Sequence, residues 1–308
     1  MKTANTPTGP ALAIQNLADA ILHTVVYADL FDYPLTSQQI HRFLTGYSAP
    51  LASVEEALAH DDRLRQRLGS IQPYWFLVGR ESLVELRRQR DAFSQSLWRK
   101  ARRYGALVAS VPFVRMVAIT GSLSMNNAID PGDDIDLLIV TAQDRLWLAR
   151  GMVILLVHLA RLERMELCPN YLMSEHRLHL GEPSLFTAHE LAQLIPLCGQ
   201  DAYHRLLDNN AWLSEYLPNF YPYRPQERKP GTLGRGTQHL LEACLSGRLG
   251  DAVERWEQGR KIAQLRQTAE HRGGRSTEFS PNLCKGHVHD HGTTIRQRYA
   301  SRLAAHGL

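Results

Sequence analysis

Two aspartates, Asp134 and Asp136, stand on either side of one isoleucine at the start of a strongly apolar segment. If this segment is an extended strand, side chains two positions apart lie on the same face. Proteins commonly hold Mg²⁺ through one or two carboxylates together with waters and substrate phosphates. The pair therefore predicts a site for Mg²⁺ (or Mn²⁺) that faces the phosphates of a nucleotide, with both aspartates as metal ligands and catalytic residues.

Gly121 and Ser122 follow a second apolar run, Val114 to Thr120. Glycine lets the backbone approach a phosphate group closely. A helix that begins here, predicted over Leu123 to Ala128, would also offer free N–H groups and a positive partial charge. We therefore expect Gly121 and Ser122 to bind the nucleotide, and the Ser122 hydroxyl to donate one further hydrogen bond.

The elements that position these residues are two buried strands. Ile135 to Val140 is a β-branched and leucine-rich run, which is typical of a strand buried on both faces. The turn before it contains Asp130, Pro131 and Gly132. Carboxylates on such a strand are held rigidly, as a preorganised site requires.

This combination resembles the signature of the DNA polymerase β-like nucleotidyltransferase superfamily. The features are an apolar strand, Gly-Ser, a gap from Leu123 to Asp133, and Asp-Ile-Asp-Leu. The resemblance implies transfer of a nucleoside monophosphate from a nucleoside triphosphate to an acceptor hydroxyl, assisted by two metal ions. The acceptor stays open between a small molecule, a protein and RNA. The alternative is that Gly-Ser and the acidic turn form an ordinary loop, since Asp-x-Asp alone is a weak motif.

Active members of that superfamily usually carry a third carboxylate on a later strand. The matching segment here, Leu167 to Ser174, contains Asn170, which is a poor metal ligand, and Glu175 follows at its far end as a possible substitute. The missing carboxylate keeps a second hypothesis open, namely a catalytically impaired nucleotide-binding or regulatory protein.

Residues 1–80 predict a winged-helix-like domain. Helices are expected over 11–30, 37–44 and 54–60, the last capped by Ser53, and strands over 64–68 and 75–78. Residues 27–36, 167–172 and 186–190 resemble a bacterial group in which such a region precedes a nucleotidyltransferase domain. A winged helix could bind DNA, but the third helix carries Glu55, Glu56, Asp61 and Asp62, and acidic side chains repel phosphate. DNA binding is therefore possible but not favoured.

The fold class expected for the whole chain is α+β. Residues 81–182 should form a nucleotidyltransferase core, a mixed sheet with flanking helices and a leading arginine-rich helix over 81–104. Residues 183–308 should form a helical C-terminal region. Helices are predicted there over 185–194, 202–209, 211–216, 237–245, 251–267 and 293–306.

Composition adds weaker constraints. The formal net charge of +4 permits binding of nucleic acid without requiring it. The four cysteines are far apart, so they predict reduced thiols and not a zinc ribbon. No signal peptide or membrane span is apparent, because the longest apolar stretch is too short, and we expect a cytoplasmic protein. Three alternating histidines from His287 to His291 could bind a transition metal or approach phosphates, but a polar loop is favoured.

Overall fold

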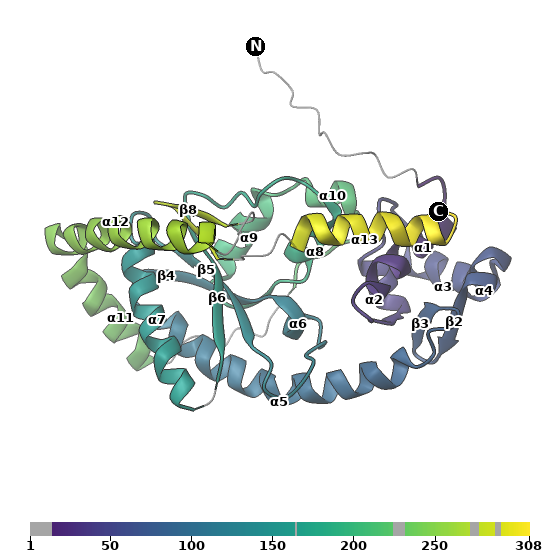
Figure 1. The fold of residues 1–308 in the computed structure, drawn as a ribbon, viewed down its shortest axis with the longest axis horizontal. Coiled ribbons are helices and arrows are strands. Elements are labelled where there is room, and N and C mark those ends of the chain that lie inside the picture. Colours follow the sequence, from purple (N-terminus) through teal and green to yellow (C-terminus); the bar gives the residue numbers. More distant parts are fainter. Residues whose placement is uncertain (1–13, 164, 224–231, 272–276, 287–290) are drawn as a thin grey trace, which may run out of the picture.

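The computed structural model describes residues 14–163, 165–223, 232–271, 277–286 and 291–308. Its centre is a six-stranded mixed sheet with the order β7-β4-β5-β6-β9-β8 (Figure 1). The bounds are β4 Val114–Ile119, β5 Ile135–Thr141, β6 Leu167–Ser174, β7 Ile195–Cys198, β8 Glu278–Ser280 and β9 Leu283–Lys285. The β5–β6 pair is parallel, and the other neighbouring pairs are antiparallel. An α+β fold with a mixed sheet and flanking helices is thus confirmed.

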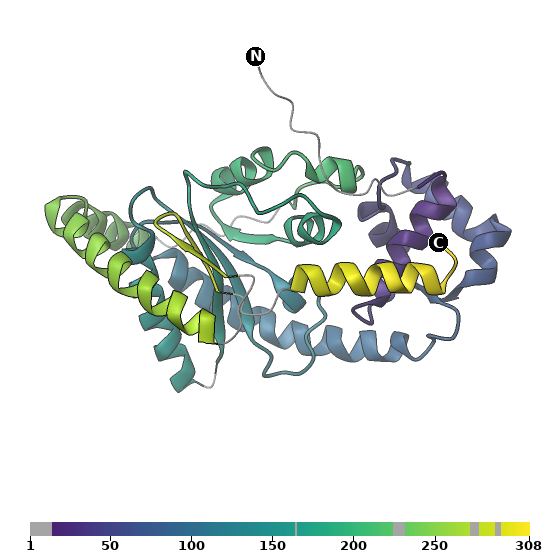
Figure 2. The same ribbon diagram turned by 45° about the horizontal axis from the view of Figure 1, so that its top comes forward.

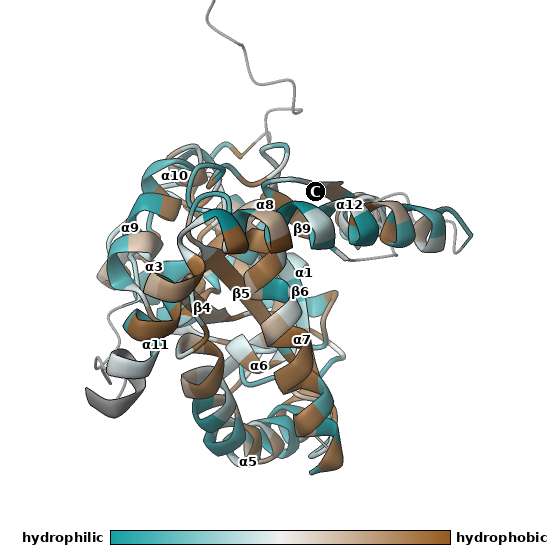
Figure 3. Cartoon of the chain, turned by 90° about the vertical axis from the view of Figure 1, so that its left-hand side faces the viewer, coloured by the Kyte–Doolittle hydropathy of each residue, from teal (hydrophilic) through white to brown (hydrophobic). Residues whose placement is uncertain are grey.

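Helices cover both faces of this sheet. Successive side chains of its central strands point to opposite faces, and each face packs into its own hydrophobic core. Val117 and Ile119 of β4 pack with Leu97 of the long helix α5 (Leu83–Ala109) and with α7 (Leu146–Leu162). Met116 and Ala118 belong to the other core. That core includes residues of α8 (Leu185–Ala192), α9 (Gln200–Asp208) and α10 (Leu213–Tyr216). Figure 3 shows the apolar strands enclosed by helices whose outer faces are more polar.

The N-terminal part lies at the other end of α5, away from α7 (Figure 1). It contains α1 Leu17–Asp29, β1 Leu35–Thr36, α2 Ser37–Arg42, α3 Leu51–His60, α4 Asp62–Arg67, β2 Leu68–Ile71 and β3 Tyr74–Leu77. The three strands form an antiparallel sheet in the order β1-β3-β2. Thr36 caps α2 in a reciprocal capping box with Gln39, so the predicted helix start is confirmed.

Two predictions about this part were wrong. Residues 64–67 are helical, because the Asp61 side chain accepts a hydrogen bond from the Leu64 N–H and starts α4. The strand begins only at Leu68. Ser53 does not cap α3, which already begins at Leu51 after Pro50.

The C-terminal region is also not purely helical, as it supplies β7, β8 and β9 to the central sheet. β7 follows α8 at once and pairs with β4, while the short β8–β9 hairpin pairs with β6. All three strands are too short for a periodic pattern to distinguish them from loops. The remaining helices are α11 Thr232–Leu245, α12 Arg248–His271 and α13 His291–Ala305.

Helix α13 crosses from the sheet to the N-terminal part and lies alongside α1 (Figures 1 and 2). The His23 Nδ1 atom lies 2.9 Å from the Tyr299 hydroxyl. Arg302 forms an ion pair with Asp29, whose side chain is only 2% exposed and is also held by Arg80 at 2.9 Å. These contacts fix the N-terminal part against the end of the chain. Among the described residues, no helix has both the length and the apolar character that a membrane span requires.

Candidate metal and nucleotide site

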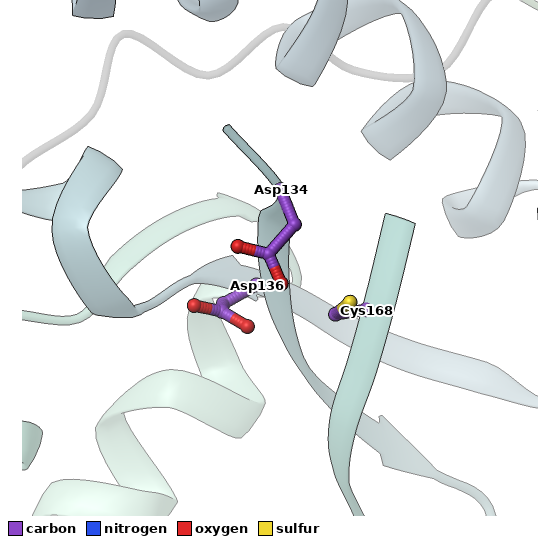
Figure 4. A group of neighbouring side chains, drawn as sticks. All are labelled: Asp134, Asp136 and Cys168. Atoms are coloured by element: carbon purple, nitrogen blue, oxygen red, sulfur yellow. The ribbon is translucent and has the colours of Figure 1, made fainter. Parts of the chain in front are cut away.

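Asp134 and Asp136 come together where β5 begins. One ligand atom from each, and the Sγ atom of Cys168, all lie within 4.8 Å of one another (Figure 4). Cys168 stands directly beside Asp136 in the parallel pair β5–β6. The two expected carboxylates therefore lie close enough to bind one ion, and the Cys168 thiol from the neighbouring strand β6 lies beside them.

The two aspartates and Cys168 are not equally suitable as ligands for a cation. Two carboxylates suit Mg²⁺ or Mn²⁺, which are oxygen-seeking ions. Burial, and then a hydrogen bond to Asp134, raises the pKa of Cys168 to about 12, so its sulfur stays protonated and is a poor ligand for Mg²⁺. The donor set that fits is therefore Asp134 and Asp136. Cys168 lies beside the two aspartates because of the register between β5 and β6, which are separated in the sequence, so the sequence alone did not predict this contact.

Gly121 lies directly against the carboxylate of Asp136. It follows β4 and begins α6 (Gly121–Ser124), with a φ of 63° in the left-handed region. A Cβ atom at this position would collide with the Asp136 Oδ2 atom. Only glycine satisfies both the conformation and the contact. The predicted nucleotide-binding turn and the predicted metal ligands are therefore neighbours in space.

The helix after this turn differs from the prediction. It covers only 121–124, not 123–128, so a helix of one turn contributes little charge at its start. The Ser122 hydroxyl donates to the Asp133 Oδ2 atom at 3.1 Å, and the Ile129 N–H donates to the same oxygen at 3.0 Å. Ser122 therefore closes the loop before β5, and its hydroxyl proton is already engaged.

Asp136 lies in a crowded negative environment. Burial, and then the charges of Asp134, Glu190 and Asp133, raise the pKa of Asp136 to about 7. The Asn170 side-chain amide donates a hydrogen bond to the Asp136 Oδ1 atom. Asn170 thus orients Asp136 from the strand where a third carboxylate was expected.

Glu175 does not reach this site. It lies just beyond the opposite end of β6 from Cys168, seven residues away, which is roughly 23 Å of extended strand. Its carboxylate binds Arg205 at 3.1 Å and accepts the Gln143 N–H at 3.3 Å. Glu175 is therefore excluded as a third carboxylate for the pair.

A different carboxylate, Glu190 in the last turn of α8, does influence the site. Its charge contributes to the raised pKa of Asp136. The Glu190 side chain is exposed to solvent in part, and the neighbouring protein that shields its carboxylate raises the pKa of Glu190 to about 7, an effect that Lys285 partly offsets. No local sequence pattern singles out Glu190 as a site residue, since only tertiary structure brings α8 near the start of β5.

Glu190 also lines a cavity of about 370 Å³. Gly121 and Ser122 form part of its wall, and most of the rest comes from α1, the residues after it, and α8. Within the wall, the rings of Tyr27 and His189 are stacked with centroids 4.0 Å apart. The cavity therefore extends from the turn at Gly121 and Ser122 into the space between the N-terminal part and the sheet.

The histidines predicted as a possible metal or phosphate site, residues 287–291, lie outside the described residues, apart from His291, where α13 begins.

The basic helix α5 contains one arginine, Arg87, that is buried. Its guanidinium lies 3.6 Å from the Tyr33 ring centroid and 3.0 Å from the Met125 carbonyl oxygen. At least this arginine of the basic helix has a structural role. All four cysteines are free thiols.

Comparisons with family models, with curated protein sequences and with solved structures found no match to this chain.

Proposed function

We propose that this chain is a metal-dependent nucleotidyltransferase that moves a nucleoside monophosphate from a nucleoside triphosphate to an acceptor hydroxyl. The observation that carries the proposal is the contact between the Asp136 carboxylate and the backbone of Gly121. That contact joins a two-carboxylate cluster to a turn with no side chain to obstruct a phosphate. A Gly-Ser turn after one strand and Asp-x-Asp at the start of the next strand support the same function.

The residues then take distinct roles. Asp134 and Asp136 would hold Mg²⁺ or Mn²⁺, and the bound ion would neutralise charge on the triphosphate. Gly121 leaves room for the phosphate chain beside Asp136. Asn170 fixes one Asp136 oxygen through its amide, and Ser122 with Asp133 holds the intervening loop in place. The N-terminal part would be winged-helix-like and would form one side of the cavity.

A nucleotide-binding protein without transfer activity is the second candidate. It is favoured by Cys168 and Asn170, which occupy the strand where an active enzyme of this type usually has a carboxylate. A DNA-binding function is less well supported, because α3 exposes Glu55 and Glu56 to solvent.

One assay separates the first two candidates. The protein is incubated with nucleoside triphosphates labelled at the α-phosphate, Mg²⁺ or Mn²⁺, and cell extract as a source of acceptors. The wild type should transfer label, whereas Asp134→Asn with Asp136→Asn should not. Asp130→Asn, a change in the exposed turn before β5, is the matched control and should retain transfer. Metal-dependent nucleotide binding without transfer would favour the second candidate.

A further inference from the structure

The cavity beside Gly121 has a wall whose chemistry differs from that of a phosphate site. Its surface is largely aromatic and aliphatic, with Tyr27, Phe31, Phe43 and Leu35 among its residues. Such a surface suits a ligand with a flat apolar part. The volume of about 370 Å³ lies in the range of small-molecule sites.

The wall offers few cations to a ligand. Asp32 and Glu190 both line the cavity, and Asp32 forms an ion pair with Arg80. Among the described lining residues Arg90 is the one lysine or arginine, and its Nη1 atom already lies 3.2 Å from both the Phe31 carbonyl oxygen and the Asn127 side-chain oxygen. With a single arginine beside two carboxylates, this wall gives little attraction to a triphosphate, whereas a neutral or cationic molecule needs no such cations.

Glu190 occupies the junction between this cavity and the metal site. It lines the cavity together with Gly121, and Gly121 lies against Asp136. A molecule in the cavity can therefore contact Glu190 while it approaches the space in front of the two aspartates. Neither Asn170 nor Cys168 offers a carboxylate on that side, and Glu175 is remote.

We propose that the cavity binds the acceptor, a small neutral or cationic molecule with a flat apolar body and a hydroxyl group, and that Glu190 accepts the proton of this hydroxyl. The proposal rests on the proposed function, since it names the acceptor class and the base for the same reaction. It also assigns to α8 the carboxylate that β6 lacks.

The proposed transfer is a displacement at the α-phosphorus of the nucleoside triphosphate. The acceptor oxygen forms a bond to the α-phosphorus of the nucleoside triphosphate. The bond between that phosphorus and the oxygen bridging to the β-phosphate breaks, and pyrophosphate leaves with the electron pair. The hydroxyl proton moves to the Glu190 carboxylate.

The surroundings of Glu190 suit this role. The ionisable groups that interact with it are Lys285 on β9, Asp136 on β5 and Tyr27 on α1. The raised pKa of Glu190, about 7, makes it a stronger base than an ordinary carboxylate while leaving it partly ionised at neutral pH.

The first arm of the test measures binding to the full-length protein. The probes are 2-phenylethanol and tyramine, each a flat ring with a hydroxyl group, and phenyl phosphate serves as the anionic comparison. Ligand-detected NMR should show binding of the first two and not of phenyl phosphate. Phe31→Ala, which removes a partly exposed wall residue, should weaken binding at least 10-fold. Binding of phenyl phosphate alone, or binding unchanged in Phe31→Ala, would overturn the cavity assignment.

The second arm measures transfer of α-phosphate label from Mg²⁺-ATP and the other nucleoside triphosphates to the same two alcohols. Glu190→Gln should bind the alcohols normally but transfer label about 100-fold more slowly. Glu182→Gln, an exposed acidic residue outside the cavity wall, is the matched control. A Glu190→Gln rate equal to that of the wild type would overturn the base assignment.

The two proposals fail in different ways. If the wild type cleaves nucleoside triphosphate to monophosphate and pyrophosphate but neither binds nor labels the alcohols, the acceptor proposal falls and the proposed function stands. If the wild type shows no metal-dependent nucleotide binding or cleavage while the alcohols still bind beside Phe31, the proposed function falls, and with it the role of Glu190, although the assignment of the cavity to an aromatic alcohol stands.

Discussion

Gly121 and Asp136 lie so close together that a Cβ atom on residue 121 would overlap the Asp136 carboxylate. The backbone of Gly121 is also left-handed, with a φ of 63°. The turn after β4 and the start of β5 are therefore built as one unit. Replacement of Gly121 tests this contact directly.

Gly121→Ala should impair both stability and ligand binding. The left-handed backbone alone costs an alanine about 1–2 kcal/mol, and the collision displaces Asp136 as well. We expect a lower midpoint of thermal unfolding and a loss of at least 10-fold in Mg²⁺-dependent nucleotide affinity, measured by calorimetry. Gly151→Ala is the control, because Gly151 lies within α7 with open space around its Cβ position. Normal nucleotide affinity in Gly121→Ala would show that the contact is irrelevant to binding.

Asn170→Asp should restore a carboxylate beside Asp136. In the absence of metal the new charge repels Asp136, so the free energy of unfolding should fall. In saturating Mn²⁺ or Mg²⁺ the loss should reverse, and the affinity for the ion should rise, since a third carboxylate becomes available to it. Denaturant unfolding with and without the ion measures both effects. An equal loss of stability in both conditions would contradict a metal site at this position.

His189 should make the protein sensitive to mild acid. Burial lowers the pKa of His189 to about 3, against 6.5 for an ordinary histidine. The unfolded chain therefore binds a proton at this histidine that the folded chain does not between these values, so the contribution of His189 lowers stability as the pH drops below 6.5. The slope contributed by one such group is up to about 1.4 kcal/mol per pH unit.

The test compares denaturant unfolding of the wild type and His189→Phe from pH 7 to pH 4.5. Phenylalanine preserves a flat ring against Tyr27 but cannot take up a proton. The variant should lose less stability over this range than the wild type. His60→Asn, at an exposed position, should leave the wild-type slope unchanged. Identical slopes for the wild type and His189→Phe would exclude His189 as the source.

Arg302→Met should loosen α13 from the N-terminal part. The change removes one of two cations from Asp29, whose side chain is only 2% exposed. Since Arg80 remains, we expect a loss of about 1–3 kcal/mol in the free energy of unfolding. Arg65→Met breaks a pair with Asp62 that is largely exposed and 3.7 Å long, so it should cost less than about 1 kcal/mol. Equal effects in urea titrations would mean that the buried pair has no special importance.

Local sequence signals predicted the parts of the fold that depend on neighbours in the chain. The apolar run after Asp134 identified β5, and Thr36 with Gln39 identified the start of α2. The cap that Asp61 provides was not recognised, so residues 64–67 were predicted as part of a strand although they are helical. The edge strand β7 was missed because its four residues include a proline and form a strand only through pairing with β4.

Within the candidate site, too, the residues close in sequence were predicted and those from distant segments were not. Asp134 and Asp136 are two positions apart, so their spacing predicted that they share one face. That Gly121 lies beside them was implied by the resemblance of the whole motif to the nucleotidyltransferase signature. Cys168 reaches them through the parallel pairing of β5 and β6, and Glu190 through the packing of α8. Contacts between distant segments leave no periodic trace in a single sequence. For the same reason, the sequence could not show that Glu175 follows the end of β6 that lies far from Asp134 and Asp136.

The most direct test of the central claim is the product released from a nucleoside triphosphate labelled at the α-phosphate. With Mg²⁺ or Mn²⁺ and an extract containing acceptors, the wild type should release pyrophosphate and leave the label on an acceptor or as monophosphate. Asp134→Asn with Asp136→Asn should release none, while Asp130→Asn should match the wild type. Pyrophosphate release that persists in the double variant would contradict the assignment of this site, and so would its complete absence in the wild type.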